Sequence, residues 1–203
     1  MQLTLFLFVP SIMSYIFRAQ GRSQPDLVEK LVSNGVVSSP EVRKAMNQVD
    51  RKNYADEDED CYFDAPLPIG CGQTISAPHM HATALEQIVP YLKKNSKERS
   101  KLSILDVGCG SGYLTAALGR LVDDSGGKEP IVGKGGKVYG IDVYPDLVDM
   151  TRENINKEDG DLLQNGIVEV DYGDGWKGLP DKSPFDAIHV GAAADTGSLA
   201  CPR

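Results

Sequence analysis

Hydrophobic positions change their spacing about halfway along the chain. In the first half they recur at helical intervals, in segments that open at or just after a proline. Proline is tolerated in the first turn of a helix because its missing N–H would have no intrahelical partner there. The pattern predicts helices over residues 26–32, 40–49 and 78–92.

In the second half, short apolar runs alternate with amphipathic segments. Strands are predicted at residues 102–107, 138–143, 167–170 and 185–190, and helices at residues 113–122 and 145–157. Strands that alternate with helices form right-handed crossovers and a mostly parallel sheet. We therefore expect an α/β, Rossmann-like fold with helices on both faces of the sheet. Such sheets bind ligands at the carboxyl ends of their strands.

A glycine-rich turn follows the first strand of this second half. Residues 105–112 read LDVGCGSG, with Gly108, Gly110 and Gly112 at alternate positions. Glycine lets the backbone pass close to a ligand and adopt positive φ. The dinucleotide fingerprint Gly-x-Gly-x-x-Gly would need a glycine where Tyr113 stands. This departure argues against a nicotinamide dehydrogenase.

Acidic residues stand at the carboxyl ends of three successive predicted strands. Asp106 belongs to the first, Asp142 to the second, and Asp174 follows the third, beside Gly175. One carboxylate alone would be compatible with an ordinary surface residue, and a glycine turn alone with a tight turn. Together they indicate a nucleoside cofactor, with Asp142 on the ribose hydroxyls and Asp174–Gly175 near the adenine amino group.

The arrangement Asp-x-Gly-x-Gly-x-Gly, which begins at Asp106, resembles the first motif of the class I methyltransferases. In those enzymes the loop wraps the amino-acid end of S-adenosylmethionine. The resemblance implies a class I methyltransferase fold and S-adenosyl-L-methionine as the cofactor. A class I methyltransferase for another carboxylate or a small molecule stays open as an alternative at this point.

Two longer segments resemble the protein-L-isoaspartate (D-aspartate) O-methyltransferase family. They are residues 73–82 (QTISAPHMHA) and residues 186–194 (DAIHVGAAA). Val49-Asp50-Arg51, Tyr54 and the Pro66-to-Gly70 stretch fit the family as well. The resemblance implies methyl transfer to the α-carboxylate of L-isoaspartyl residues, and less efficiently to D-aspartyl residues, in damaged proteins. The methyl ester then collapses to a succinimide that reopens partly to normal aspartate, which is protein repair.

The same resemblance implies roles for individual residues. Ser76 contacts the substrate carboxylate as the active-site residue, and His81 helps to close the site. The substrate side comprises Gln73, Thr74, Ser76 and His81, and the cofactor side Thr74, Ile75, Ser76, His81, Asp106, Gly108, Gly110, Gly112, Asp142, Asp174 and Gly175.

The chemistry agrees with these roles. A carboxylate is already ionised at neutral pH, so no general base is required. The protein has to align and desolvate the reactants, and a hydroxyl such as Ser76 can hydrogen-bond the nucleophile without taking its proton. The alternative for Ser76 is a helix cap. His189 is expected to be a partly buried strand residue, and Trp176 to pack rather than bind.

Composition and charge narrow the choice of partners. The net charge of −8 and the pI of about 4.9 argue against a nucleic-acid binder. Cys61, Cys71, Cys109 and Cys201 include no Cys-x-x-Cys pair, so we expect reduced thiols. His79 and His81 stand at alternate positions of a helix and point to different faces, so we expect no metal site. We expect a monomer whose substrates are isoaspartyl-containing proteins and peptides.

The two ends of the chain depart from this pattern. Residues 3–17 are almost continuously apolar, which suits a signal-peptide core, but no Lys or Arg precedes them and Pro10 interrupts them. We expect a cytoplasmic protein, with a secretory or membrane-associated one as the alternative. Residues 195–203 (DTGSLACPR) replace the helix and further strands of the family. The sheet is therefore expected to end after its fourth strand, with an exposed apolar edge.

These patterns divide the 203-residue chain into four parts. An apolar, flexible N-terminal extension (1–24) precedes a helical segment on the substrate side (25–101). The Rossmann-like, S-adenosylmethionine-binding core (102–195) and a tail outside the family pattern (196–203) follow. A non-catalytic or impaired truncated fragment is the alternative to an active enzyme.

Overall fold

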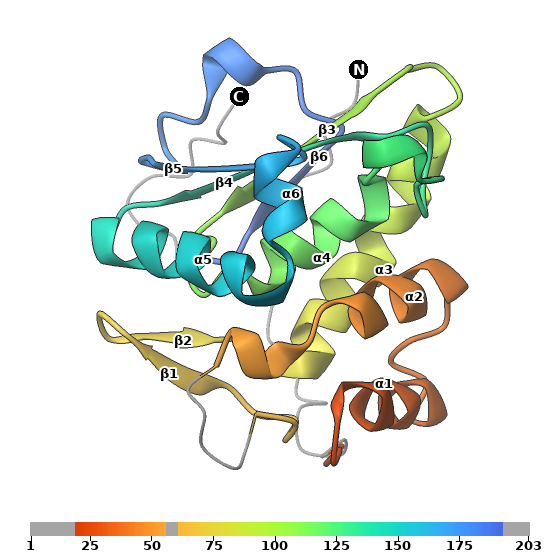
Figure 1. Cartoon of the computed structure of the whole chain (residues 1–203), viewed down its shortest axis with the longest axis vertical. Helices are drawn as coiled ribbons and strands as arrows, with labels where there is room; N and C mark the ends of the chain where they lie inside the picture. Colours follow the sequence, from red (N-terminus) through yellow and green to blue (C-terminus); the bar gives the residue numbers. More distant parts are fainter. Residues whose placement is uncertain (1–18, 56–60, 193–203) are drawn as a thin grey trace.

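A computed structural model of the chain describes residues 19–55 and 61–192 (Figure 1). The apolar run at residues 3–17, the tail and Cys201 lie outside the described residues. The N-terminal half holds α1 (Gln24–Ser33), α2 (Pro40–Gln48), the 3-10 turn η2 (Arg51–Asn53), β1 (Leu67–Gly70), β2 (Gln73–Ile75) and α3 (Pro78–Asn95). The three helices predicted here are confirmed, and α3 runs three residues further than the pattern suggested.

The C-terminal half builds a parallel sheet of four strands. They are β3 (Leu102–Val107), β4 (Gly136–Asp142), β5 (Val168–Tyr172) and β6 (Ala187–Val190), in the spatial order β5-β4-β3-β6. All three pairings are parallel, as predicted. The chain steps outward from β3 through β4 to β5 and then returns to the other side of β3. The sheet therefore has its switch in strand order between β3 and β6.

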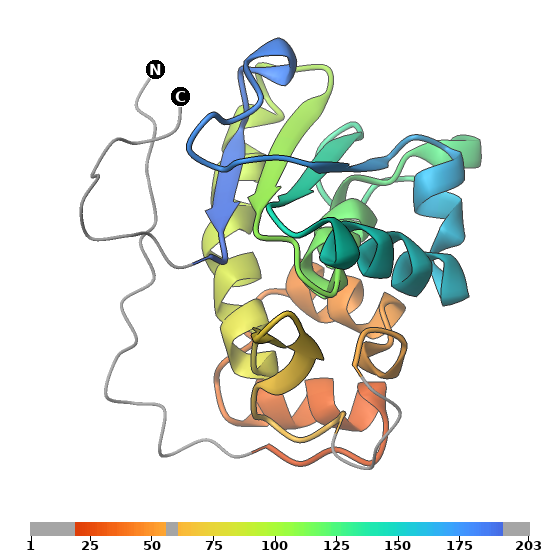
Figure 2. The same ribbon diagram turned by 90° about the vertical axis from the view of Figure 1, so that its left-hand side faces the viewer.

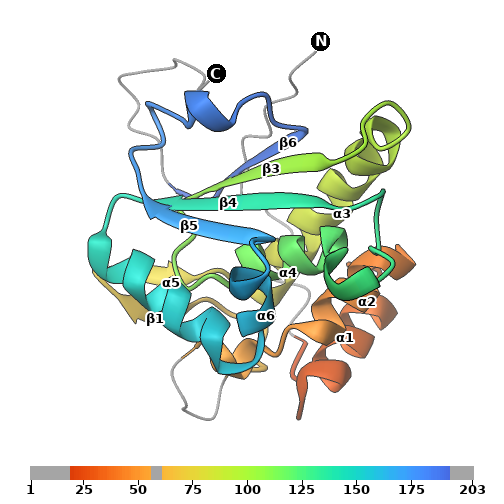
Figure 3. The ribbon, with the colours of Figure 1, turned by 45° about the horizontal axis from the view of Figure 1, so that its top comes forward.

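The helices of the described chain cover one face of this sheet. α3, α4 (Tyr113–Val122), α5 (Pro145–Glu158) and the short α6 (Gly160–Gln164) lie on that side (Figure 3). We expected helices on both faces, but the opposite face is covered by the segment between β5 and β6, which carries only the 3-10 turn η4 (Pro180–Lys182). Phe185 and Leu179 of that segment pack against apolar side chains of β3, β4 and β6. The crossover from β5 to β6 therefore places a 3-10 turn, and no α-helix, on this face of the sheet.

Several short elements of the described chain escaped the sequence patterns. η3 (Ser125–Gly127) lies in the loop between α4 and β4, and α6 adds one turn after α5. β1 and β2 form an antiparallel hairpin whose turn, Gly70-Cys71-Gly72, has positive φ at all three residues. Strands of four and three residues are too short to show a period, so only their pairing defines them.

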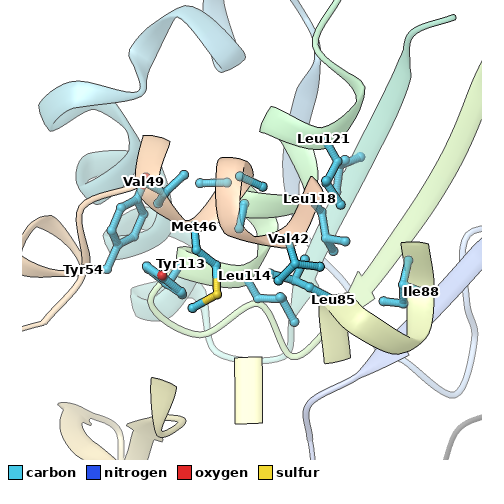
Figure 4. Packing of buried hydrophobic residues seen from close by; sticks show 14 of the residues in the cluster. Val42, Met46, Val49, Tyr54, Leu85, Ile88, Tyr113, Leu114, Leu118 and Leu121 are labelled. Atoms are coloured by element: carbon cyan, nitrogen blue, oxygen red, sulfur yellow. The ribbon is translucent and has the colours of Figure 1, made fainter. Parts of the chain in front are cut away.

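One hydrophobic core joins the N-terminal helices to the sheet. Val42 and Met46 of α2 meet Leu85 of α3 and Leu114 and Leu118 of α4 (Figure 4). The helices α2 and α3 therefore bury the outer side of α4, whose inner side packs on β3 and β4. Residues 25–101 are held on the sheet half by this shared packing.

No helix among residues 19–55 and 61–192 combines the length and the apolar character that crossing a membrane requires.

A truncation in the shared core should show how strongly it holds the molecule. Leu118→Ala removes a fully buried side chain, and we expect it to lower the free energy of unfolding by about 2–5 kcal/mol. Urea denaturation followed by circular dichroism measures this change. Leu163→Ala is the matched control, because Leu163 is only partly buried at the rim of the same core. Equal losses for the two variants would contradict the packing described here.

Candidate active site

The glycine-rich turn between β3 and α4 is fixed by hydrogen bonds to β4 and to α5. The amide of Gly108 donates to the carbonyl oxygen of Ile141 at 2.8 Å, next to the end of β4. From α5, the Thr151 hydroxyl donates to the carbonyl oxygen of Gly110 at 2.7 Å, and the Asn154 side-chain amide to that of Ser111 at 3.0 Å. The loop is therefore fixed at the carboxyl ends of β3 and β4 before any ligand binds.

Each of the three predicted loop glycines has a positive φ, of 78° at Gly108, 56° at Gly110 and 89° at Gly112. A Cβ on Gly112 would lie 2.8 Å from Cγ2 of Thr151, and a Cβ on Gly108 would lie 3.0 Å from the Cβ of Ala192. Gly110 differs, because its nearest neighbour outside the loop is the Cδ1 of Ile69 at 3.4 Å. The first and last glycines are required by packing, and the middle one faces the β1–β2 hairpin.

Two of the predicted acidic residues lie beside this loop. The Asp142 carboxylate is buried and accepts hydrogen bonds from the amides of Gly110 and Tyr144, both at 3.1 Å. Asp174 accepts from the amide of Trp176 at 3.0 Å. The following Gly175 passes so close to β3 that a Cβ there would lie 2.4 Å from Cγ1 of Val107. The folded chain thus brings Asp142 and the Asp174–Gly175 turn to the same edge of the sheet.

Large apolar side chains are exposed at that edge. Val143 is 50% exposed, Tyr144 is 42% exposed and Trp176 is 44% exposed. Trp176 was expected to pack rather than bind, and its side chain is partly exposed here instead of being buried in the core. An exposed apolar surface next to buried carboxylates is typical of a site for a ligand with both aromatic and polar parts.

Asp106 lies deeper than the other acidic residues. Its side chain is 1% exposed, and one oxygen accepts from the Thr115 hydroxyl at 2.5 Å. The other oxygen lies 2.8 Å from Nδ1 of His189 on the neighbouring strand. Both oxygens are engaged beneath the glycine loop, so a direct contact between Asp106 and a cofactor stays a prediction.

Ser76 lies between β2 and α3 and is half-buried. It does not cap α3, because the N-cap residue is Ala77 and no side chain of the cap bonds to the helix. The cap comes instead from Asp64, whose Oδ1 accepts from the backbone amide of His79 at 2.9 Å and lies 2.8 Å from its Nδ1. A carboxylate at a helix N-terminus is favourable. The capping alternative for Ser76 is therefore wrong, and its hydroxyl is not used by the helix.

In Figure 2 the β1–β2 hairpin, which leads to Ser76, lies beside α3 and below the carboxyl end of β3. A Cβ on Gly110 would lie 3.4 Å from Cδ1 of Ile69, so the Ile69 side chain of β1 lies next to the glycine loop. Gln73 and Thr74 on β2 are exposed, whereas Ile75 is buried in the core.

His81, on the first turns of α3, is buried against the start of α4. Its ring lies 4.9 Å from the Tyr113 ring, centroid to centroid, and its Nδ1 has no hydrogen-bond partner among the described residues. Burial holds the pKa of His81 well below its usual value, and the nearby charge of Arg51 lowers it further. The imidazole is therefore neutral at physiological pH.

Arg51 is a member of this cluster that sequence reasoning did not place in the site. Its side chain is completely buried, and its guanidinium lies 5.8 Å from the centroid of the Tyr113 ring. One hydrogen bond goes from Nη2 to the carbonyl oxygen of Ala65 at 3.3 Å, whereas Nε and Nη1 have no partner among the described residues. Burial lowers the pKa of Arg51 to about 10. The only available signal was the Val49-Asp50-Arg51 motif.

A separate hollow of about 510 Å³ opens beside α5 and β5. It contains none of the site residues predicted above, and its lining consists of Pro145, Val148, Asp149, Arg152, Asp171, Tyr172 and Leu179. Among the described residues, no group of three or more His, Cys, Asp or Glu side chains is placed to hold a metal ion. The described cysteines, Cys61, Cys71 and Cys109, are free thiols.

The chain is similar to proteins of one family over most of its length. Residues 22–198 match the sequence profile of protein-L-isoaspartate(D-aspartate) O-methyltransferase. The protein-L-isoaspartate O-methyltransferase of Caenorhabditis elegans is 39% identical over 88% of this chain and 71% of its own length. The one from Triticum aestivum is 40% identical over 88% of this chain and 72% of its own length.

A solved structure has the same fold. It is a protein-L-isoaspartate O-methyltransferase from Plasmodium falciparum in complex with S-adenosyl-L-homocysteine. Its sequence is 32% identical, and the superposition, with a TM-score of 0.70, covers 85% of this chain and 75% of that one.

Gly112→Ala tests the packing of the glycine loop. We expect a loss of stability from two sources, about 1–2 kcal/mol of backbone strain at positive φ and a clash with Cγ2 of Thr151. Adding Thr151→Ser removes that methyl group but keeps the hydroxyl, so the double variant should recover part of the loss. Gly35→Ala is the control for strain alone, since Gly35 has a φ of 72° and open space around it. If the melting temperature of Gly112→Ala is no lower than that of Gly35→Ala, the clash assigned to Gly112 is contradicted.

Asp64→Ala tests the cap of α3. The variant loses the cap, which is worth about 0.5–2 kcal/mol, and also removes a negative charge that acts on buried Arg51. Asp64→Asn keeps an oxygen for the His79 amide and should recover part of the stability. Chemical denaturation of both variants measures the difference. If Asp64→Ala unfolds at the same denaturant concentration as the unchanged protein, the assigned cap is wrong.

Proposed function

The chain belongs to the protein-L-isoaspartate (D-aspartate) O-methyltransferase family, and we propose how its residues carry out the reaction. The enzyme transfers a methyl group from S-adenosylmethionine to the α-carboxylate of L-isoaspartyl residues in damaged proteins. The observation that carries the assignment of residues is the position of the Ile69 side chain beside Gly110, where a Cβ would lie 3.4 Å from Cδ1 of Ile69. Since Ile69 belongs to the hairpin that leads to Ser76, this position supports placing Ser76 near the glycine loop.

The residues at the edge of the sheet fit the cofactor. S-adenosylmethionine supplies a methyl group that its sulfonium centre activates for attack by a weak nucleophile. The loop from Gly108 to Gly112 would hold its amino-acid end, because its glycines at positive φ let the backbone pass close to a ligand. Asp142 would hold the ribose hydroxyls, and the exposed Tyr144 and Trp176 provide apolar surface for the adenine ring. Thr74 and Ile75 would close this site from the hairpin side.

Asp174 and Gly175 would lie at the adenine amino group. Asp174 accepts one hydrogen bond, from the Trp176 amide, and a carboxylate can accept more than one. A second donor such as an exocyclic amino group can therefore bind to it without breaking the turn.

Ser76 would bind the substrate carboxylate. Because Asp64 caps α3, the Ser76 hydroxyl is free to donate to an anionic oxygen. Gln73 and Thr74 are exposed on the hairpin, where a peptide chain can reach them. The substrate needs no general base, since its carboxylate is ionised at neutral pH. The work of the site is to align the carboxylate and exclude water.

His81 would contribute as a neutral group. A protonated imidazole beside a sulfonium cation would repel it, and burial among Tyr113, Arg51 and the start of α3 keeps His81 uncharged. Its Nδ1 is buried and has no hydrogen-bond partner among the described residues. A monomer in the cytoplasm stays our prediction for the assembly and location of the enzyme.

The assay compares two peptides that differ only in one linkage. Labelled methyl from S-adenosylmethionine should appear on an isoaspartyl peptide and not on its normal aspartyl twin. Ser76→Ala removes a hydrogen bond to a charged group, so we expect kcat to fall about 10- to 100-fold, while the cofactor affinity measured by calorimetry changes little. Ser100→Ala, at an exposed position, is the control variant.

Equal labelling of both peptides would contradict isoaspartyl specificity and favour an enzyme for another carboxylate. Absence of labelling with intact cofactor binding would favour a non-catalytic chain. A large loss of cofactor affinity in Ser76→Ala would refute the substrate role assigned to Ser76.

A further inference from the structure

His189 lies at the switch in strand order, where open α/β sheets bind their ligands. It belongs to β6 and stands opposite Asp106 of β3 in the parallel register. From the sequence, His189 was predicted only to be a partly buried residue of a strand. In the folded chain its side chain is 24% exposed, so part of the ring is open to solvent.

The ring of His189 is oriented by a buried carboxylate. Its Nδ1 lies 2.8 Å from Oδ1 of Asp106, and the second oxygen of Asp106 is fixed by the Thr115 hydroxyl at 2.5 Å. A carboxylate is an acceptor only, so it selects a ring with a proton on Nδ1. Nε2 has no hydrogen-bond partner in the described part of the chain. Such an arrangement fixes one ring nitrogen and leaves the other for a ligand, as in other carboxylate–histidine pairs.

Gly191 stands between the His189 ring and the glycine loop. The amide of Gly191 donates to the carbonyl oxygen of Val107 at 2.8 Å, and this hydrogen bond fixes the end of β6 next to the start of the glycine loop. A Cβ on Gly191 would lie 3.1 Å from Cε1 of His189 and 3.3 Å from the carbonyl oxygen of Gly108. Any larger residue at Gly191 would therefore displace either the ring or the loop.

α3, which begins just after Ser76, packs on β6. His189 therefore stands on the strand that α3 covers, beside the strand β3 that leads into the glycine loop.

We propose that His189 is a substrate-binding residue of the methyl transfer, with Asp106 as the residue that positions its ring. Nε2 of His189 forms a hydrogen bond with the isoaspartyl residue, on the side of the site opposite Ser76. Asp106 then acts through His189, in place of the direct cofactor contact that the family resemblance implied. This inference rests on the proposed function and names a second residue for the same substrate.

Two substitutions separate the two nitrogens of the ring. His189→Asn keeps a donor for Asp106 at the position of Nδ1 but has nothing at the position of Nε2. We expect it to raise KM for the isoaspartyl peptide about tenfold, the effect of one lost hydrogen bond, while stability and cofactor affinity stay close to those of the unchanged enzyme. His189→Gln, whose longer amide reaches toward the position of Nε2, should recover part of the loss.

Asp106→Asn tests the positioning role. The amide can donate to the ring and allows it to turn, so we expect the same rise in KM for the peptide with little change in the dissociation constant of S-adenosylmethionine. A change confined to cofactor affinity would instead mean that Asp106 contacts the cofactor directly, and would overturn its role as a positioning residue.

A His189→Asn enzyme with unchanged KM and kcat would refute the proposal, because the bond to Asp106 that a purely structural histidine needs is kept in this variant. The unchanged enzyme must first methylate the isoaspartyl peptide. Failure of that reaction would overturn the proposed function, whereas the result with His189→Asn concerns the histidine alone.

Discussion

The parallel pairing of β3 with both β4 and β6 is the constraint on which the site depends. It brings the carboxyl ends of three strands to one edge, so that the loop after Val107 starts between Ile141 on one side and Val190 on the other. The same register sets Asp106 opposite His189. A shift of one residue in either pairing would turn these side chains to the other face of the sheet.

The glycine loop is the second fixed point, and two parts of the chain hold it. α5 binds its carbonyl oxygens through Thr151 and Asn154. On the other side, Tyr113 at the start of α4 is buried among Arg51, Tyr54 and His81. This aromatic and cationic cluster connects the N-terminal helices to the loop, and it brings the substrate-side segment beside the cofactor-side one.

Four aspartates in and around the site differ in their burial and in their hydrogen-bond partners. Asp64 caps α3 and leaves Ser76 free, and Asp106 orients His189 from below the loop. Asp142 and Asp174, which lie at the edge, keep acceptor capacity for a ligand. The structural role of Asp64 and the positioning and binding roles proposed for the other three differ because the fold gives each carboxylate a different set of neighbours.

The sequence by itself determined the α/β class, the four strands, the main helices and the three loop glycines. Hydrophobic period and glycine spacing are local properties, and the apolar runs and amphipathic segments from which these elements were predicted are long enough to show them. The family motifs predicted Ser76 and His81 as site residues, and the position of Asp142 and Asp174 at the carboxyl ends of successive strands predicted these two.

Tertiary structure alone decided what depends on contacts between distant segments. The covering of one sheet face by an irregular segment, the cap supplied by Asp64 and the pairing of Asp106 with His189 all join residues from separate elements. The β1–β2 hairpin joins neighbouring segments, but its strands are too short to show a period and only their pairing defines them. The sequence alone does not distinguish an aspartate that binds a ligand from one that is hydrogen-bonded to a histidine. The packing of the folded chain decides which partner each aspartate has.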